Sequence, residues 1–314
     1  MSNLYPGNRK HKAWTSIDGL ASGTVSALAV GWHENATFFA GTRGGLYKTN
    51  ALDQPTPPWQ SVPGAPLEII TLAVSPTYAA DQTIFVGGGQ GLWISRNDGA
   101  QWQAMRTPMP NSIILCLSLS PQYQVDGIIL AGTLEDGIYY SDSRGERWSY
   151  RGFGLLDSTV YTLAISPNFA QDETIFAGTE TALYYSYNGG RAWKQLAFPE
   201  AAAPVLSLAV SPQFAQDQTL YAGTEQHGLY RSVDGGQSWQ PVNLPATTIN
   251  TLAFSPDGAL HAATDSGLYR LTERGERWAC LLDQPDVFSL AFDANFLITG
   301  LVDGSTWLTC DRLE

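Results

Sequence analysis

The sequence has 314 residues, with 17 Lys and Arg against 29 Asp and Glu, which gives a formal net charge of −12. An acidic protein repels phosphate backbones, so this charge argues against a nucleic-acid-binding protein. Aromatic residues make up 11% of the chain and charged residues only 15%, below the ~25% usual for soluble domains. Such a composition is typical of a packed core and excludes a disordered chain.

The sequence also lacks the patterns of a membrane-spanning helix, a signal peptide and a metal site. No apolar stretch reaches the ~18 residues of a membrane-spanning helix, so we expect no membrane insertion. Residues 1–12 are polar and lack the apolar centre of a signal peptide. The three cysteines, Cys116, Cys280 and Cys310, do not have the spacing of a disulfide framework or a zinc site. We therefore expect a cytoplasmic protein with no metal and no other cofactor.

The first predicted strand, at residues 13–17, precedes seven copies of a repeated unit. Each copy opens with an apolar strand, often followed by Ser-Pro, as in residues 71–76 (Thr-Leu-Ala-Val-Ser-Pro). The copies begin near residues 25, 69, 114, 160, 205, 249 and 287. A repeat of ~45 residues must be interpreted before any single element, because it determines the whole fold.

Each copy continues with three further strands. The second ends in a small-residue turn, as in residues 175–179 (Ile-Phe-Ala-Gly-Thr), the third follows as in residues 228–231, and the fourth begins at a tryptophan such as Trp193. Short runs rich in β-branched and aromatic residues, bounded by Gly, Pro, Asn and Asp, indicate strands. No segment has the 3.6-residue periodicity of a helix. Four strands in ~45 residues match one propeller blade.

The seventh copy ends after its third strand, near residues 307–309. The strand at residues 13–17 would complete this blade and remove an open sheet edge. We therefore predict an all-β fold in which residues 1–314 form one seven-bladed β-propeller. Its blades are four-stranded and antiparallel, and the N-terminal strand closes the last blade.

A hairpin recurs between the third and fourth strands, and its best copy is residues 232–239 (Ser-Val-Asp-Gly-Gly-Gln-Ser-Trp). This pattern resembles the Asp-box, or bacterial neuraminidase repeat, of sialidases, sortilin-type receptors, xyloglucan hydrolases and photosystem II assembly factors. The resemblance covers nearly the whole chain and implies a propeller whose boxes lie on the periphery. We predict a structural role in the hairpin turns for Asn97, Trp102, Trp148, Asn188, Trp193, Asp234, Trp239 and Trp278.

Ligands of propellers usually meet the mouth, which is formed by the loops between second and third strands and by the loops that lead into the next blade. Five blades carry a carboxylate in the first set of loops, which predicts an acidic rim that binds a cation or a basic segment of a partner protein. The alternative is a solvated rim that keeps the protein soluble. The predicted binding residues are Arg43, Glu135, Asp136, Glu180, Glu225, His227, Asp265 and Asp303.

Two functions are compatible with this pattern. Regular blades and short connections favour a non-enzymatic scaffold that presents a rigid disc to a protein partner. The alternative is a carbohydrate-active enzyme or a lectin, for which a glycosidase needs two carboxylates about 5 to 10 Å apart. Its residues would be the acids Asp18, Asp157 and Asp286 and the aromatics Trp93, Phe153 and Tyr161. The Phe/Tyr-Arg-Ile-Pro motif of sialidases is absent.

Overall fold

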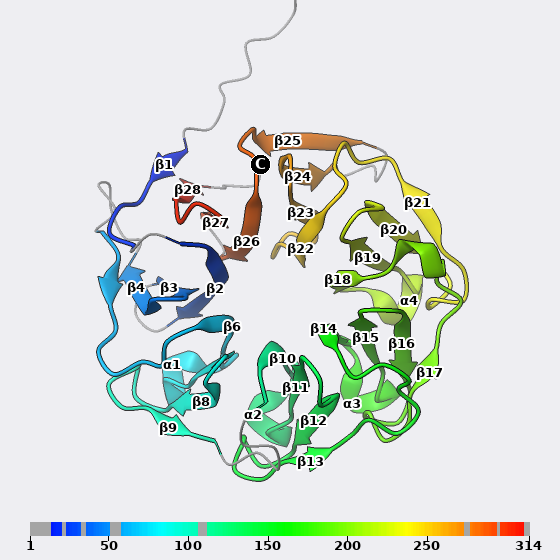
Figure 1. Cartoon of the computed structure of the whole chain (residues 1–314), viewed down its shortest axis with the longest axis horizontal. Coiled ribbons are helices and arrows are strands. Elements are labelled where there is room, and N and C mark those ends of the chain that lie inside the picture. Colours follow the sequence, from blue (N-terminus) through cyan, green and yellow to red (C-terminus); the bar gives the residue numbers. More distant parts are fainter. Residues whose placement is uncertain are drawn as a thin grey trace, which may run out of the picture.

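The computed structural model describes residues 14–20, 23–32, 36–50, 58–105, 112–272, 277–293 and 296–310. Seven four-stranded antiparallel sheets surround a central axis (Figure 1). The predicted seven-bladed propeller is therefore confirmed. Within the described ranges, none of the helices has the length and hydropathy to span a bilayer.

The strands of blades 1 to 6 run outward from the axis in sequence order (Figure 1). Blade 1 contains β2 (Val25–Trp32), β3 (Ala36–Thr42), β4 (Gly45–Asn50) and β5 (Gln60–Ser61), and blade 2 contains β6 (Ile69–Val74), β7 (Ile84–Gly88), β8 (Gly91–Ser95) and β9 (Gln103–Ala104). Blade 3 contains β10 (Ile114–Leu119), β11 (Ile129–Thr133), β12 (Ile138–Ser141) and β13 (Ser149–Tyr150), and blade 4 contains β14 (Val160–Ile165), β15 (Ile175–Thr179), β16 (Leu183–Ser186) and β17 (Lys194–Gln195). Blade 5 contains β18 (Val205–Val210), β19 (Leu220–Thr224), β20 (Leu229–Ser232) and β21 (Gln240–Val242), and blade 6 contains β22 (Ile249–Phe254), β23 (Leu260–Thr264), β24 (Gly267–Leu271) and β25 (Trp278–Leu282).

Blade 7 is assembled from both ends of the described chain. It contains β26 (Val287–Phe292), β27 (Phe296–Leu301) and β28 (Thr306–Cys310), and its outermost strand is β1 (Thr15–Ser16). Thr15 pairs with Leu308 and Ser16 with Trp307 in antiparallel register. The predicted closure by the N-terminal strand is confirmed.

The Ala-Gly-Thr segments, predicted as turns, lie inside the second strand of their blades. In blade 4 they belong to β15, where the Thr179 hydroxyl donates a hydrogen bond of 2.9 Å to the Ala182 carbonyl and so closes the next hairpin. A Cβ atom on Gly178 would lie 2.8 Å from a methyl of Val205 in blade 5. The glycine is therefore required by the close approach of the next blade rather than by a turn.

Four one-turn helices connect first and second strands in blades 2 to 5, where the sequence predicted no helix. They are α1 (Tyr78–Asp81), α2 (Tyr123–Asp126), α3 (Phe169–Asp172) and α4 (Phe214–Asp217), and a 3-10 turn, η1 (Glu200–Ala202), follows blade 4. The buried aromatic that opens each helix packs toward the preceding blade, as Phe214 does on Phe176 with ring centres 5.7 Å apart. Blade 6 has a tight turn instead, in which Ser255 donates its N–H to the Ala259 carbonyl.

Candidate functional site at the channel mouth

A central channel of about 330 Å³ is lined by residues of the seven innermost strands. Every one of these strands has a β-bulge at its second residue, and a bulge turns an extra side chain out of the sheet register. The seven bulged residues all line the channel, and we call them the collar: Ser26, Ile70, Leu115, Tyr161, Leu206, Asn250 and Phe288. Four of the seven side chains are fully apolar, so the collar can accept an apolar group.

The collar lies on the same face as the loops between second and third strands. In blade 4, for example, Val160 at the start of β14 is paired with Thr179 at the end of β15. The bulged residue Tyr161 follows directly, and so does the loop after Thr179. The collar and the predicted rim therefore share the mouth of the channel.

Hydrogen bonds between blades hold the wall below the collar. The hydroxyls of Ser207, Thr251 and Ser289 donate to the first-strand backbone carbonyls of the next blade, at 2.9, 2.7 and 2.7 Å. The last of these bonds joins blade 7 to Val25 of blade 1. These bonds join blades 5, 6, 7 and 1 at the channel wall.

The rim acids Glu180, Glu225 and Asp265 occupy equivalent positions in three successive blades. Each directly follows the second strand, and each backbone N–H donates to a carbonyl of the loop that leads into the same blade, at 3.2 to 3.3 Å. In blade 3 the corresponding acid, Glu135, lies one residue further along the loop. The four acids thus follow one another around an arc of the mouth over blades 3 to 6.

Some rim acids serve to fix their own loops. Three accept a hydrogen bond of 2.6 to 2.7 Å from a nearby hydroxyl: Asp136 from Ser112, Asp265 from Thr247, and Asp303 from Ser305. For Asp303, the bonds from the side chain and the backbone of Ser305 hold the pKa of its carboxyl below the ordinary value. These carboxylates already have donors, although the Oδ1 atom of Asp265 is buried without a partner among the described residues.

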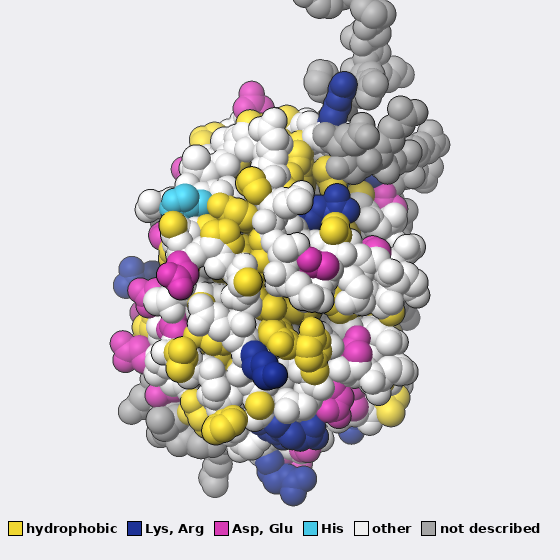
Figure 2. All heavy atoms as spheres, turned by 90° about the vertical axis from the view of Figure 1, so that its right-hand side faces the viewer, with side chains coloured by type: hydrophobic (Ala, Val, Ile, Leu, Met, Phe, Trp, Pro, Cys, Tyr) yellow, Lys and Arg dark blue, Asp and Glu magenta, His cyan; other side chains and the backbone are white. Residues whose placement is uncertain are grey.

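Three glutamates differ from these acids. Glu135, Glu180 and Glu225 are exposed, and their carboxylates accept no hydrogen bond from the described residues. Figure 2 views the disc from the side of blades 4 and 5 and shows acidic side chains spread over this surface with hydrophobic side chains between them. Net charge alone therefore does not distinguish the mouth from the rest of the surface. The mouth is distinguished by three adjacent blades that each carry a carboxylate with no hydrogen-bond donor among the described residues.

Tyr161 links the rim to the collar. Its pKa is raised above the ordinary value, first by desolvation and then by the carboxylates of Glu180, Glu225 and Asp157. The rim glutamates of blades 4 and 5 thus lie near enough to act on a phenol that lines the channel. The rim residues themselves are not among those that line the channel, so the acidic rim borders the apolar collar.

The other two predicted binding residues lie in loops of the same kind. His227 is exposed in blade 5, where its backbone N–H donates to the Thr224 hydroxyl at 3.0 Å. Arg43 is exposed in blade 1, and its carbonyl accepts the N–H of Glu68. Like the six rim acids, neither side chain is among the channel-lining residues.

The three acids of the glycosidase alternative are not brought together. The Asp18 carbonyl accepts the N–H of Trp59, which precedes the outermost strand of blade 1, so Asp18 lies at the outer edge. Both carboxylate oxygens of Asp157 are hydrogen bonded, to Thr159 and to Thr181. Asp286 lies beside Asp265, to whose carbonyl it donates its N–H.

Of the three aromatics in that alternative, Tyr161 alone lines the channel. Phe153 is 77% exposed, and its carbonyl accepts the N–H of Trp193 at the outer edge of blade 4. The indole of Trp93 donates to the Gln90 carbonyl within its own blade. No group of three or more His, Cys, Asp or Glu side chains that could hold a metal occurs in the described ranges.

The box residues lie in the turns between third and fourth strands, away from the channel. In blade 5 the Ser232 hydroxyl donates to Asp234 at 2.7 Å and accepts the N–H of Gly236 at 2.8 Å, and Asp234 accepts the N–H of Ser238 at 2.9 Å. Bonds from Ser238 lower the pKa of Asp234 to about 2. Ser232 was not among the residues predicted to hold this turn, although it stands at the first position of the box.

Equivalent bonds occur in other blades. Asn97 and Asn188 each accept the N–H four residues later, from Gln101 and Ala192. In blade 3, where the sequence lacks the acid, the Ser143 hydroxyl accepts the N–H of Arg147 at 2.9 Å. Of the box tryptophans, Trp193 is buried, and the remaining four are half-buried: Trp102, Trp148, Trp239 and Trp278.

Comparison with known proteins extends the description of the fold. A family model described as the DUF6242 beta propeller domain matches residues 174–288. No curated protein matches the sequence. Two crystal structures of the extracellular domain of BT4673 from B. thetaiotaomicron, described as a one component system in one and a hybrid two component system in the other, superpose with a TM-score of 0.74.

The two structures are 17% and 16% identical to this chain and cover 95% and 94% of it. The chain spans 40% and 39% of the length of those proteins. At such identities the likeness concerns the fold alone. The chain is a seven-bladed β-propeller domain.

Proposed function

We propose that this propeller is a non-enzymatic interaction module that binds a basic segment of a partner protein at the channel mouth. The observation that carries the proposal is the position of Glu180 and Glu225. Their carboxylates have no partner among the described residues, and their charges contribute to the raised pKa of the collar residue Tyr161. Lys or Arg side chains of a partner would neutralise these carboxylates. An adjacent apolar side chain would enter the collar.

Physical considerations support a segment rather than a folded surface. The channel, at about 330 Å³, is at the lower end of the ~300–1,000 Å³ found for ligand pockets, which suits one or two side chains. Complementary charge at the rim would increase the association rate and make binding sensitive to salt. Burial of an apolar side chain in the collar would slow dissociation.

Two further parts of the proposal concern family and location. The box hydrogen bonds made by Ser232 and Asp234 support the Asp-box resemblance found in the sequence. Cytoplasmic localisation stays a prediction that rests on the cysteines and the polar residues 1–12, and fractionation of cells that produce the full-length protein tests it. The two solved structures named above, which share this fold, are extracellular domains.

The proposal is tested by selecting binders from a displayed library of random peptides and measuring them by calorimetry at two ionic strengths. We expect enriched peptides to combine Lys or Arg with an apolar residue, and to bind less tightly at the higher salt concentration. The triple variant Glu135→Lys, Glu180→Lys and Glu225→Lys should lose binding. The matched control, Asp142→Lys, Glu146→Lys and Asp283→Lys, changes the same number of exposed acids elsewhere and should retain it.

Two results would contradict the proposal. One is peptide binding that is equal in the triple variant and its control. The other is binding of a glycan array that is lost in Tyr161→Ala, with no peptide enriched, since that outcome would favour the lectin alternative.

A further inference from the structure

The loop that leads into blade 4 carries two of the three most exposed large apolar side chains in the described ranges. Phe153 is 77% exposed and Leu156 is 85% exposed. Leu155, beside them, already anchors the loop, because it packs against a buried cluster that includes Trp193. Single exposed apolar residues are common on protein surfaces, but two in one anchored loop mark a surface for contact.

The backbone of this loop is fixed on blade 4. The Phe153 carbonyl accepts the N–H of Trp193 at 2.9 Å, next to the fourth strand, and the N–H of Leu156 donates to the hydroxyl of Tyr184, in the third strand, at 3.4 Å. Gly154 has a φ of +91°, and a Cβ atom there would collide with the Trp193 carbonyl oxygen. The two apolar side chains are therefore held over the third and fourth strands.

These side chains continue a line that begins at the channel. Tyr161 lies on the first strand of blade 4 and Glu180 directly follows the second, while Leu156 and Phe153 lie over the third and the fourth. Neighbouring strands are about 4.8 Å apart, so the line runs outward for roughly 15 Å. We call it the radial track: Tyr161, Glu180, Leu156 and Phe153.

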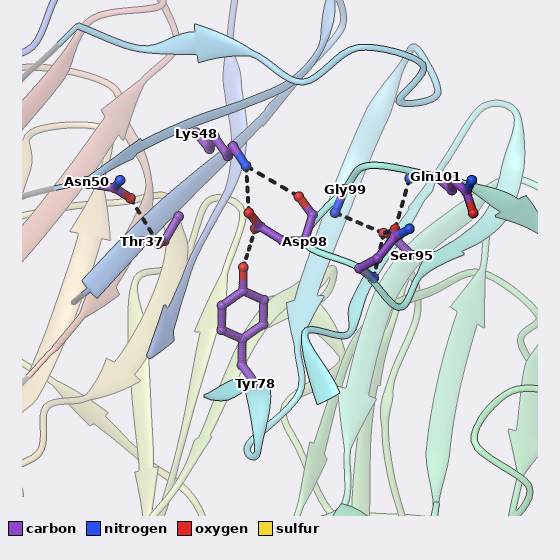
Figure 3. Close-up of polar contacts among 9 residues, drawn as sticks. Thr37, Lys48, Asn50, Tyr78, Ser95, Asp98, Gly99 and Gln101 are labelled. Carbon is purple, nitrogen blue, oxygen red and sulfur yellow. Dashed lines mark hydrogen bonds and ion pairs between the residues drawn. The ribbon is translucent and has the colours of Figure 1, made fainter. Parts of the chain in front are cut away.

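The carboxylate in the radial track has no cation of its own. At the junction of blades 1 and 2 the chain supplies one, since Lys48 forms an ion pair of 2.7 Å with Asp98, which also accepts a hydrogen bond from the Tyr78 hydroxyl (Figure 3). Glu180 has no ion pair with any described residue. A cation that neutralises Glu180 would therefore come from a partner.

Among the described loops, this combination is specific to blade 4. In blade 1, Asp18 takes the place of Phe153, because its carbonyl accepts the equivalent tryptophan N–H. In blade 2, Gly89 directly follows the second strand, where Glu180 stands in blade 4. In blade 5 the large apolar residue of the loop, Phe198, is buried, and the loops into blades 6 and 7 have no exposed large apolar side chain.

We propose that the radial track binds an extended segment of a partner protein with the pattern apolar, any residue, Lys or Arg, any residue, apolar. This inference rests on the proposed function, because it specifies the segment that the mouth binds. One apolar side chain would enter the collar beside Tyr161, the cation would pair with Glu180, and the second apolar side chain would cover Leu156 and Phe153.

The length of the radial track determines this spacing. An extended chain rises about 3.3 Å per residue, and successive side chains point to opposite sides. Side chains two positions apart therefore share one face at a separation of about 6.6 Å, and three of them span roughly 13 Å. That span is close to the length of the track. The pattern reads the same in both chain directions, so the segment can run inward or outward.

Two synthetic peptides of the same composition test the pattern, by calorimetry with the full-length protein. In the first, Leu-Ser-Lys-Ser-Leu-Ser-Lys-Ser-Leu, leucine and lysine share one face of an extended chain. In the second, Leu-Lys-Ser-Ser-Leu-Lys-Ser-Ser-Leu, they lie on opposite faces. We expect the first to bind about tenfold more tightly or better, since it alone can place a cation and apolar side chains on the track together.

The double variant Phe153→Ser with Leu156→Ser should weaken binding of the first peptide about tenfold or more. The matched control, Val125→Ser with Val233→Ser, removes two exposed apolar side chains from turns on the face opposite the mouth and should bind like the wild type. All four side chains are exposed, and the loop hydrogen bonds of Phe153 and Leu156 use backbone atoms. Both variants should therefore melt like the wild type, and melting curves check this.

Three results would overturn the radial track: no saturable binding of the first peptide, equal affinity for the two peptides, or unchanged binding of the first peptide by the variant of Phe153 and Leu156. The triple variant Glu135→Lys, Glu180→Lys and Glu225→Lys, measured in the same assay, separates this inference from the proposed function. Loss of binding in the triple variant together with equal affinity for the two peptides would overturn the track and leave the proposed function standing. Binding of the first peptide that survives in the triple variant would contradict both.

Discussion

Val25, the first residue of the innermost strand of blade 1, packs on Gly300 in the second strand of blade 7. A Cβ atom at Gly300 would lie 2.5 Å from both the Cβ and a Cγ of Val25, closer than two carbon atoms can approach. The same contact recurs around the ring, where a glycine faces the β-branched residue that opens the next blade: Gly41 and Ile69, Gly87 and Ile114, Gly132 and Val160, Gly178 and Val205, and Gly223 and Ile249. The contact between Val25 and Gly300 is the one that closes the circle.

Added volume at Gly300 should therefore weaken the closure of the ring. We expect Gly300→Ala to lower the free energy of unfolding by about 1 kcal/mol and Gly300→Val by about 3 kcal/mol, the range for overpacked cores. The smaller loss for alanine is expected because blade 6 has Ala263 at the equivalent register position. Urea unfolding measures the loss of unfolding free energy in both variants. The double variant Gly300→Val with Val25→Ala should lose less unfolding free energy than the two single variants together, and strict additivity would contradict a direct contact between the two residues.

Removal of β1 should destabilise the whole propeller. Ile17 is buried beside this strand, its N–H donates to the Thr306 carbonyl, and the indole of Trp14 donates to the Leu281 carbonyl at 2.8 Å. Deletion of residues 1–20 exposes this surface and the edge of β28, and should cost about 3 kcal/mol or more at ~25 cal/mol per Å². Deletion of residues 1–13 alone is the control, and equal melting temperatures of the two truncated proteins would show that β1 contributes nothing.

Trp193 should be the most costly of the box tryptophans to remove. It is buried, and its indole N–H donates to the Arg151 carbonyl at 2.6 Å across the junction of blades 3 and 4. We expect Trp193→Ala to cost about 3–5 kcal/mol in a denaturation experiment. Trp193→Phe, which keeps a ring but loses the donor, should cost about 1–3 kcal/mol. Trp102→Ala, at a half-buried position, should cost less than Trp193→Ala, and the reverse order would contradict this assignment.

Stability should fall at alkaline pH. Burial raises the pKa of the Cys116 thiol to about 12, and burial together with the charge of Asp81 raises the pKa of the Tyr123 phenol to about 12, from ordinary values of 9.0 and 10.0. Between those ordinary values and about 12, the unfolded chain releases protons that the folded chain keeps, so the unfolding free energy decreases as the pH rises through this window. Below it both groups are protonated in either state, and their contribution is fully present.

Urea unfolding at several values between about pH 8 and about pH 11 measures this slope. Tyr123→Phe removes one titrating group from the core while keeping the ring that packs on Phe85, and its slope should be shallower. Tyr150→Phe, at an exposed position, is the matched control. Parallel slopes for wild type and Tyr123→Phe would show that the Tyr123 phenol does not contribute.

The sequence was sufficient for the fold because each repeat carries its own strands and turns. The pairing of β1 with β28 followed from a blade without a fourth strand. The one-turn helices could not be predicted in the same way, because four residues such as Phe169–Asp172 are too short to show a 3.6-residue period. In α3, Asp172 marks the end of the helix, where its carboxylate accepts hydrogen bonds from the Ser166 hydroxyl and from the N–H of Thr174.

The candidate site was predicted less completely. Sequence position placed Glu135, Glu180, Glu225 and Asp265 in corresponding loops, but it could not distinguish the three exposed glutamates from Asp265. That distinction depends on Thr247, a residue of another loop. The collar was missed because a β-bulge leaves no periodic pattern in the sequence.

The pairing of Thr15 with Leu308 has a consequence for the order in which the molecule folds. Within this domain β1 is synthesised before blades 1 to 6, while β28, the strand with which it pairs among the described residues, is synthesised after them. Blades 1 to 6 can form as they emerge from the ribosome, but the seventh cannot be completed before β28 has emerged. Since contacts that are distant in sequence form slowly, docking of β1 should be a late folding step, and until then the edge of β28 is open to pairing with another molecule.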